Sequence, residues 1–354
     1  MNIKYLLPFA VAAVMFGCSD DSSTPAAATD PSATDPTAQT PTDPAATDPA
    51  ATDPAATDPA ATDPAATDPA ATDPAATDPA ATEPAATDPA NPSASTSVNL
   101  GPDDYCKVDP AAPSAVAFDA TKSYKFYGCE LTGRDSYKYG RFEARIKMAA
   151  TSGTVSSMFL YYDNSYLGEG EKWNEVDIEI LGNKPTGMQT NIISGTLEKK
   201  VTSEDKPDLG FDATECFHLY GMIWTPEYVA WEIDSVEVRR DSLGMTKAQV
   251  EDLTESQSLR FNLWASKTPA WTGAFTGEGL PVEEHIDYVR VYSYDEATKG
   301  FNLLWQDDFE GEDLDLNRWA KGNWDMENVK YRTKNIRVEN GFAKIRLDFD
   351  EVAE

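Results

Sequence analysis

Histidine and cysteine are scarce in this sequence, which narrows the chemistry it can support. His218 and His285 are its only histidines, and its four cysteines have no spacing typical of a zinc site. Three cysteines follow residue 100, an odd number that leaves room for one disulfide in an oxidising compartment. We expect the bond to join Cys106 and Cys129, because both precede the main run of strands.

Basic residues are also few, with 29 Lys and Arg against 60 Asp and Glu. Residues 20–88 hold fourteen acids and no base, yet 46 acids and 28 bases still follow residue 100. An acidic surface disfavours nucleic acid as a partner, whereas a neutral polymer such as a glucan would not be repelled.

A long hydrophobic run is lacking. The apolar stretch of residues 1–17 is too short to cross a bilayer and is typical of a secretory signal. Cys18 follows it at once, as at a bacterial lipidation site, so we expect a lipid anchor there. The chain would then be an exported lipoprotein on the outer membrane or cell surface, and the alternative is a secreted protein cut nearby.

Residues 18–100 lack the apolar content needed for a core and repeat Thr-Asp-Pro-Ala-Ala. A proline at every fifth position blocks helix and sheet, and repeated acids keep the segment extended. The segment reads as a disordered spacer that holds a domain away from a membrane. The alternative is a passenger sequence that adds only solubility.

Residues 101–354 are long enough for one large domain, and helical periodicity is nearly absent from them, except at residues 246–256. Alternating apolar residues, with β-branched and aromatic enrichment, predict many short strands. The expected strands are 141–150, 154–163, 175–182, 188–195, 217–234, 259–266, 288–294 and 341–349. Turns are expected at residues 225–227 and 233–235. This pattern predicts an all-β fold, an antiparallel β-sandwich or jelly roll whose bent sheet holds an extended ligand in a concave cleft.

Residues 173–182, WNEVDIEILG, alternate acid and apolar positions. A period of two places Glu175, Asp177 and Glu179 on one face of a strand and Val176 and Ile178 on the other. Because like charges in a row repel, the arrangement suggests a function. The alternative is an outward face bathed by water, with its charges balanced by neighbours.

Strand residues four apart have Cα atoms about 13 Å apart. Retaining glycosidases need carboxyl groups about 5–5.5 Å apart, and inverting enzymes need about 6.5–9.5 Å. On a concave strand the long side chains of Glu175 and Glu179 can lean together, with Asp177 between them. Acids crowded in a partly dry site cannot all ionise, so one keeps the proton that a leaving group needs.

Aromatic and amide side chains recur on the neighbouring strands. Pyranose rings stack on aromatic faces, and amides and Arg bind hydroxyl groups. Any one of these aromatics could simply be core, but together they favour a saccharide site. The residues concerned are Phe159, Tyr161, Trp173, Gln189, Asn191, Arg260, Asn262, Trp264, Trp271 and Trp324.

With these motifs in view, the domain resembles the bacterial lichenases, the 1,3-1,4-β-glucanases of glycoside hydrolase family 16. WNEVDIEILG is very similar to the family's catalytic strand, and the similarity extends over most of residues 129–294. The stretch that ordinarily opens the domain, here residues 309–324, follows the one that ordinarily closes it, here 285–294. The resemblance therefore implies a circularly permuted domain, which is tolerable because sandwich termini lie close together.

Carried over residue by residue, the resemblance implies that Glu175 is the nucleophile, Glu179 the general acid/base and Asp177 a residue that tunes the pair. It adds Glu130 and Asn164 to the glucan contacts above. It also implies a structural calcium bound by one Asp side chain and backbone carbonyls, at Asp287, Asp308 and Gly341. The alternative is an exposed Asp287 without a metal.

The resulting expectation is a monomeric glycoside hydrolase that cleaves mixed-linkage 1,3-1,4-β-glucan internally with retention and uses no catalytic cofactor. Two alternatives remain: the same fold acting on laminarin, xyloglucan or a galactan, or a non-catalytic glucan-binding lipoprotein.

Overall fold

The computed structural model describes residues 106, 113, 116–168, 170–245 and 249–352. The expected signal, the Cys18 lipidation site and the spacer lie outside these residues. The described part is nearly all β, and the one α-helix found there, α1 (Pro269–Thr272), has four residues. None of its helices has the length and apolar character needed to span a bilayer.

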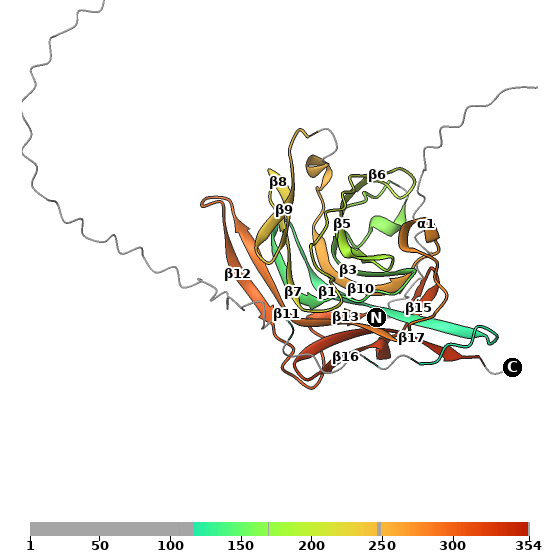
Figure 1. Cartoon of the computed structure of the whole chain (residues 1–354). Coiled ribbons are helices and arrows are strands. Elements are labelled where there is room, and N and C mark those ends of the chain that lie inside the picture. The colour runs from blue at the N-terminus through green and yellow to red at the C-terminus, as the bar shows by residue number, and fades with distance from the viewer. Residues whose placement is uncertain (1–105, 107–112, 114–115, 169, 246–248, 353–354) are drawn as a thin grey trace, which may run out of the picture. The chain divides into compact units, whose positions relative to one another are not determined.

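Sheet I, as we call the layer that carries the acid row, is an antiparallel ladder that curls in Figure 1. In spatial order its strands are β13 (Trp319–Lys321), β1 (Tyr124–Tyr137), β10 (Gln257–Ala265), β3 (Thr154–Tyr161), β4 (Glu175–Leu181), β5 (Lys184–Gly195) and β6 (Lys200–Thr202).

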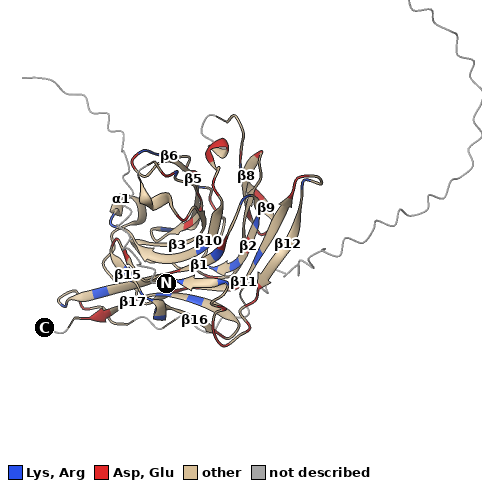
Figure 2. Cartoon of the chain, turned by 180° about the vertical axis from the view of Figure 1, so that it is seen from behind, with Lys and Arg blue, Asp and Glu red and all other residues tan. Residues whose placement is uncertain are grey.

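Sheet II, the second layer, is also antiparallel. In spatial order its strands are β16 (Ile336–Glu339), β17 (Phe342–Glu351), β11 (Val282–Asp295), β2 (Gly140–Lys147), β7 (His218–Trp224), β8 (Tyr228–Ile233) and β9 (Val236–Ser242), and β12 (Gly300–Asp307) pairs with the second half of β11. Figure 2 shows blue segments on β2, where Arg141 pairs with Glu143 and Arg145 pairs with Asp287. These cations are therefore neutralised within the layer.

The remaining elements of the described chain are short. They are η2 (Ser165–Leu167), η3 (Val250–Asp252), β14 (Asp325–Met326), β15 (Val329–Tyr331) and η4 (Thr333–Asn335). Of these, β15 pairs with β1 in parallel.

The two ends of the domain lie side by side. Tyr124 of β1 is the register partner of Glu351 of β17, and Lys122 forms an ion pair with Glu351 at 2.8 Å. In Figure 1 the red C-terminal strands accordingly lie along the teal β1.

The core fills the space between the layers. The apolar side of β4, with Val176, Ile178 and Ile180 fully buried, faces a core that includes Trp231 of sheet II. Because those alternate positions are committed to the core, the residues between them must face the other way.

The strand predictions are confirmed, and so are both turns of the β7–β8–β9 meander, where Asp234 and Ser235 adopt positive φ. Several strands were missed, of which β1 and β12 are the longest. Gly128 and Gly133 interrupt the apolar pattern of β1, yet the first glycine is needed because a Cβ there would collide with the Leu263 carbonyl oxygen of β10. β12 exposes consecutive leucines and so lacks alternation.

The disulfide prediction was wrong. Cys106 is bonded to Cys216, and Cys129 is a free, buried thiol on β1. Cys129 points into the core and its Sγ contacts the Gly322 carbonyl oxygen at 3.5 Å, so it is not available to Cys106.

Candidate active site

The three carboxylates of β4 lie on the face of sheet I that is turned away from the core. Their register partners on β3 are Tyr161 for Glu175, Phe159 for Asp177 and Ser157 for Glu179. On β5 the partners of Asp177 and Glu179 are Asn191 and Gln189. Since residues directly opposite one another share a face, the register collects the predicted acids, amides and aromatics on one surface.

Glu175 is held by a tryptophan and lies near a cation. The Trp173 indole Nε1–H donates to Glu175 Oε2 at 2.7 Å. Burial raises the pKa of Glu175, while the positive charge of Lys200 and the Trp173 hydrogen bond oppose that rise. Lys200 and the indole both favour the ionised carboxylate, the form that a nucleophile requires.

Glu179 has a different environment. Burial and the charge of Glu175 raise the pKa of Glu179 to about 8, against a hydrogen bond of 2.7 Å from Gln189 Nε2. The Gln189 Oε1 accepts from Trp271 Nε1 at 2.9 Å, which fixes the orientation of the amide. Glu179 therefore keeps its proton at neutral pH and can act as an acid.

Asp177 lies between the two glutamates and is buried. Burial, followed by the charges of Glu175 and Glu179, raises the pKa of Asp177 well above its usual value. Its backbone oxygen accepts a hydrogen bond of 2.9 Å from Trp231 Nε1 of sheet II. This bond ties the centre of the acid row to the opposite layer, so the backbone under the site is anchored from below.

Polar groups from β10 and β1 extend the site. Arg260 pairs with Glu130 at 2.9 Å and with Asp163 at 2.8 Å. Asn262 accepts from Ser157 at 2.5 Å and donates to Glu130 at 3.4 Å. The network holds its members in fixed orientations, as recognition of hydroxyl groups requires.

The predicted aromatics divide into two sets. Phe159, Tyr161 and Trp173 pack together and are nearly buried, Trp173 being only 2% exposed. Trp264 and Trp271 form a second pair, with ring centroids 5.9 Å apart. The first set therefore supports the acids, and the partly exposed Trp271 is better placed to meet a ligand.

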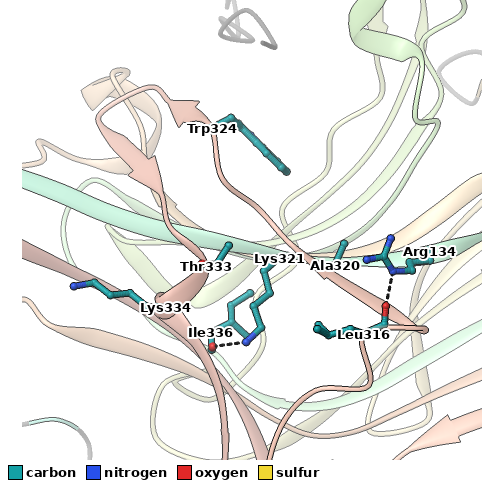
Figure 3. A pocket seen from close by; sticks show the side chains of 8 residues that line it. All are labelled: Arg134, Leu316, Ala320, Lys321, Trp324, Thr333, Lys334 and Ile336. Carbon is teal, nitrogen blue, oxygen red and sulfur yellow. Dashed lines mark hydrogen bonds between the residues drawn. The ribbon is translucent and has the colours of Figure 1, made fainter. Parts of the chain in front are cut away.

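Trp324 lies at the β1 edge of the site, since a Cβ on Gly322 would contact both Glu130 and the Trp324 ring at 3.2 Å. Trp324 also lines a cavity with a volume of about 700 Å³, whose lining side chains are drawn in Figure 3. Its lining residues are Arg134, Leu316, Ala320, Lys321, Trp324, Thr333, Lys334 and Ile336. The carboxylates of β4 are not among them, so this cavity does not contain the acid row.

Two of the predicted glucan contacts, Asn191 and Asn164, form hydrogen bonds to residues outside the acid row. Asn191 Oδ1 accepts from the Ser203 backbone N–H at 3.0 Å. Asn164 is an exposed residue before η2 and donates to the Tyr162 hydroxyl at 3.1 Å. Asn164 is not joined to the acid row by any hydrogen bond within the described residues.

The predicted calcium residues converge through the backbone. β11 pairs with β17 up to Ile286 and with β12 from Val289, so Asp287 lies where one neighbour gives way to the other. Asp308 follows β12 directly and Gly341 precedes β17. Within the described ranges there is no group of three or more His, Cys, Asp or Glu able to hold a metal. The convergence suits a site of one carboxylate and backbone carbonyls, although Asp287 also accepts from Arg145 at 2.6 Å.

Lys200 is a residue of the site that the sequence did not predict. It comes from the short strand β6, and its Nζ lies 3.3 Å from the centroid of the Trp173 ring. The sequence shows only a Lys-Lys pair after a turn, so no alternation pointed to it.

An all-β sandwich with two glutamates in contrasting environments on one face of a strand is the arrangement expected of a glycoside hydrolase. Residues 106–290 match the profile of glycosyl hydrolases family 16. The chain belongs to this family.

Several proteins are similar in sequence to large parts of this chain. A β-glucanase of Fibrobacter succinogenes is 44% identical over 243 residues, covering 67% of this chain and 68% of the relative. A β-glucanase of Bacillus subtilis is 32% identical over 173 residues, 48% of this chain and 64% of that protein. Among solved structures, a Bacillus licheniformis β-glucanase is 28% identical and matches 47% of this chain and 71% of its own, with a TM-score of 0.39.

Proposed function

We propose that the chain hydrolyses mixed-linkage 1,3-1,4-β-glucan within the polymer, with retention of configuration. The observation that supports the proposal most strongly is the contrast between the environments of two glutamates on β4. Glu175 lies near a cation and an indole donor, whereas Glu179 has a pKa of about 8. Retaining hydrolysis needs one ionised and one protonated carboxyl group facing the same sugar.

The reaction divides into two balanced steps. The Glu175 carboxylate attacks the anomeric carbon and forms an ester bond to it, the glycosidic C–O bond breaks, and Glu179 gives its proton to the departing oxygen. Water then attacks the same carbon as Glu179 takes its proton, and Glu175 leaves as a carboxylate. Asp177, hydrogen-bonded to Glu175, buffers the charge of the row between the steps.

The choice of polymer is supported by the relatives, which are named β-glucanases. It is also supported by the site, where neutral donors and acceptors such as Asn262 and Gln189 accompany the partly exposed Trp271. An uncharged glucan needs hydroxyl recognition and stacking and no ion pair.

Digestion of a polysaccharide panel tests the substrate. We expect short oligosaccharides from barley glucan, no release by Glu175→Ala, and a loss of roughly 10²–10⁴-fold in Glu179→Gln with binding retained. Cleavage of pure 1,3-glucan without cleavage of barley glucan would refute the substrate assignment. Affinity for barley glucan without any cleavage would favour the non-catalytic alternative.

Further proposals concern the chain around the site. We propose that it is a lipoprotein anchored through Cys18 on the outer membrane or cell surface, that residues 18–100 space the domain from the membrane, and that it acts as a monomer. The pairing of Tyr124 with Glu351 supports a circular permutation, because it shows the two ends of the domain adjacent. A structural calcium at Asp287, Asp308 and Gly341 would stabilise the junction of β11, β12 and β17 and has no proposed part in the chemistry.

A further inference from the structure

A tight turn between β5 and β6 places Lys200 near the acid row. Gly195, the last residue of β5, is the register partner of Lys200 at the start of β6. A Cβ on Gly195 would collide with the Lys199 carbonyl oxygen, and its φ is +91°. Only glycine fits such a tight reversal easily, so the turn returns the chain with Lys200 over the end of the row.

The same turn also holds Trp173. The Trp173 backbone N–H donates to the Gly195 carbonyl oxygen at 2.8 Å, while the Lys200 ammonium covers the indole ring at 3.3 Å. Tyr161 packs edge-on against the indole at 5.5 Å. Trp173 is thus fixed on its face, its edge and its backbone, and the polar group of its side chain, Nε1–H, donates to Glu175.

A lysine that only packed its methylene stem would keep its ammonium group in water. Here the ammonium lies over a buried ring, and burial lowers the pKa of Lys200 while the charges of Glu175 and Asp177 raise it. Desolvation of this cation is therefore offset by the ring and by the carboxylates.

We propose that Lys200 is a positioning residue that locks the Trp173 indole against Glu175 and supplies the positive charge that keeps the Glu175 carboxylate ionised for attack. The inference rests on the proposed function, because it assigns a part in the same reaction.

Several other titratable or charged groups lie near Glu175. They are Asp177 and Glu179 on β4, the neutral Tyr161 on β3, Arg260 on β10, Glu130 on β1 and Lys200 on β6. Arg260 is engaged by Glu130 and Asp163, so part of its charge is already neutralised. Lys200 has no carboxylate within ion-pair distance in the described part of the chain, and its charge is shared between Glu175 and Asp177.

The test is the pH dependence of kcat/KM on barley glucan for the full chain and three variants. Lys200→Met keeps the stem and removes the charge, Lys200→Arg keeps the charge, and Lys199→Met removes a neighbouring exposed charge. In Lys200→Met we expect the acid limb to move to higher pH, with a loss of roughly tenfold at pH 5 that narrows by pH 8. Lys200→Arg and Lys199→Met should follow the wild type, and melting curves should confirm that each variant is folded.

An acid limb unchanged in Lys200→Met would overturn the inference, whatever happens to total activity, and so would an equal shift in Lys200→Arg. Absence of hydrolysis by the wild type would instead refute the proposed function. In that case NMR titration of the labelled glutamate carboxyls still tests Lys200, because loss of its charge should raise the pKa of Glu175. An unchanged titration would overturn the inference independently of any activity.

Discussion

Gln189 connects Glu179 to Trp271, donating through Nε2 to the carboxyl at 2.7 Å and accepting through Oε1 from the indole at 2.9 Å. The amide therefore cannot flip without losing both bonds. Because the donated hydrogen bond favours the ionised carboxyl, it lowers the pKa of Glu179, against burial and the charge of Glu175.

These two hydrogen bonds of Gln189 predict how kcat/KM falls at alkaline pH, which we call the alkaline limb of the pH profile. The first step needs protonated Glu179, so kcat/KM should fall as pH rises through about 8. In Gln189→Met the lost donor should raise the pKa of Glu179 and move the limb to higher pH, alongside a lower overall rate. Asn183→Ala is the matched control, since it removes an exposed hydrogen bond of 3.1 Å to the Trp271 backbone oxygen and leaves Gln189 in place. A limb that stays fixed in Gln189→Met would contradict this assignment.

Glu284 predicts an unusual dependence of stability on pH. It is fully buried between the sheets, where burial raises its pKa to about 8 against a hydrogen bond of 2.6 Å from Ser156. The folded state keeps a proton that the unfolded chain releases above its ordinary value of 4.5, so the contribution of Glu284 to stability falls between pH 4.5 and about 8. At about 1.4 kcal/mol per pKa unit, Glu284→Gln should be more stable than the wild type at pH 8 by several kcal/mol.

The neighbouring Glu283 supplies the control. Burial disfavours its charge, yet hydrogen bonds from His285, Arg337 and Arg346 lower its pKa to about 2. Its stabilising contribution is present above pH 4.5 and is lost as pH falls toward 2. Denaturant unfolding at several pH values should therefore give gains at high pH for Glu284→Gln and losses there for Glu283→Gln. Equal effects at pH 5 and pH 8 for Glu284→Gln would contradict the buried-proton account.

The Cys106–Cys216 bond predicts redox-dependent stability. It spans 110 residues, a loop length for which a chain-entropy argument gives a stabilisation of about 3–5 kcal/mol. Reduction should lower the melting temperature of the wild type and leave Cys216→Ser unchanged, and Cys129→Ala should keep the wild-type response. If reduction changed Cys216→Ser as much as the wild type, another linkage would be responsible.

Calcium removal should act on stability before activity. The proposed residues Asp287, Asp308 and Gly341 lie at the β11–β12–β17 junction, in sheet II, whereas the acid row lies on sheet I. We expect chelation to lower the melting temperature, with Asp287→Asn insensitive to it, while initial rates at room temperature change little. An unchanged melting curve would argue against a bound metal.

How much the sequence predicts depends on how local each feature is. The acid row was predictable because a period of two is a property of seven consecutive residues, Glu175–Leu181. The position of Lys200 depends on a reversal at Gly195, and the partner of Cys106 lies 110 residues away, so neither leaves a local pattern. Glu283 and Glu284 are the same residue type at consecutive positions, but they face opposite sides of β11. Only the packing around that strand lowers the pKa of Glu283 and raises the pKa of Glu284.

In the proposed mechanism, Glu175 and Glu179 of β4 act on a single sugar, the first as nucleophile and the second as acid. This can be tested by NMR observation of the reducing end released in the first seconds of glucan digestion. Retention predicts that the β-anomer appears first and then mutarotates. First release of the α-anomer would mean that water attacks the sugar directly and that Glu175 is not the nucleophile.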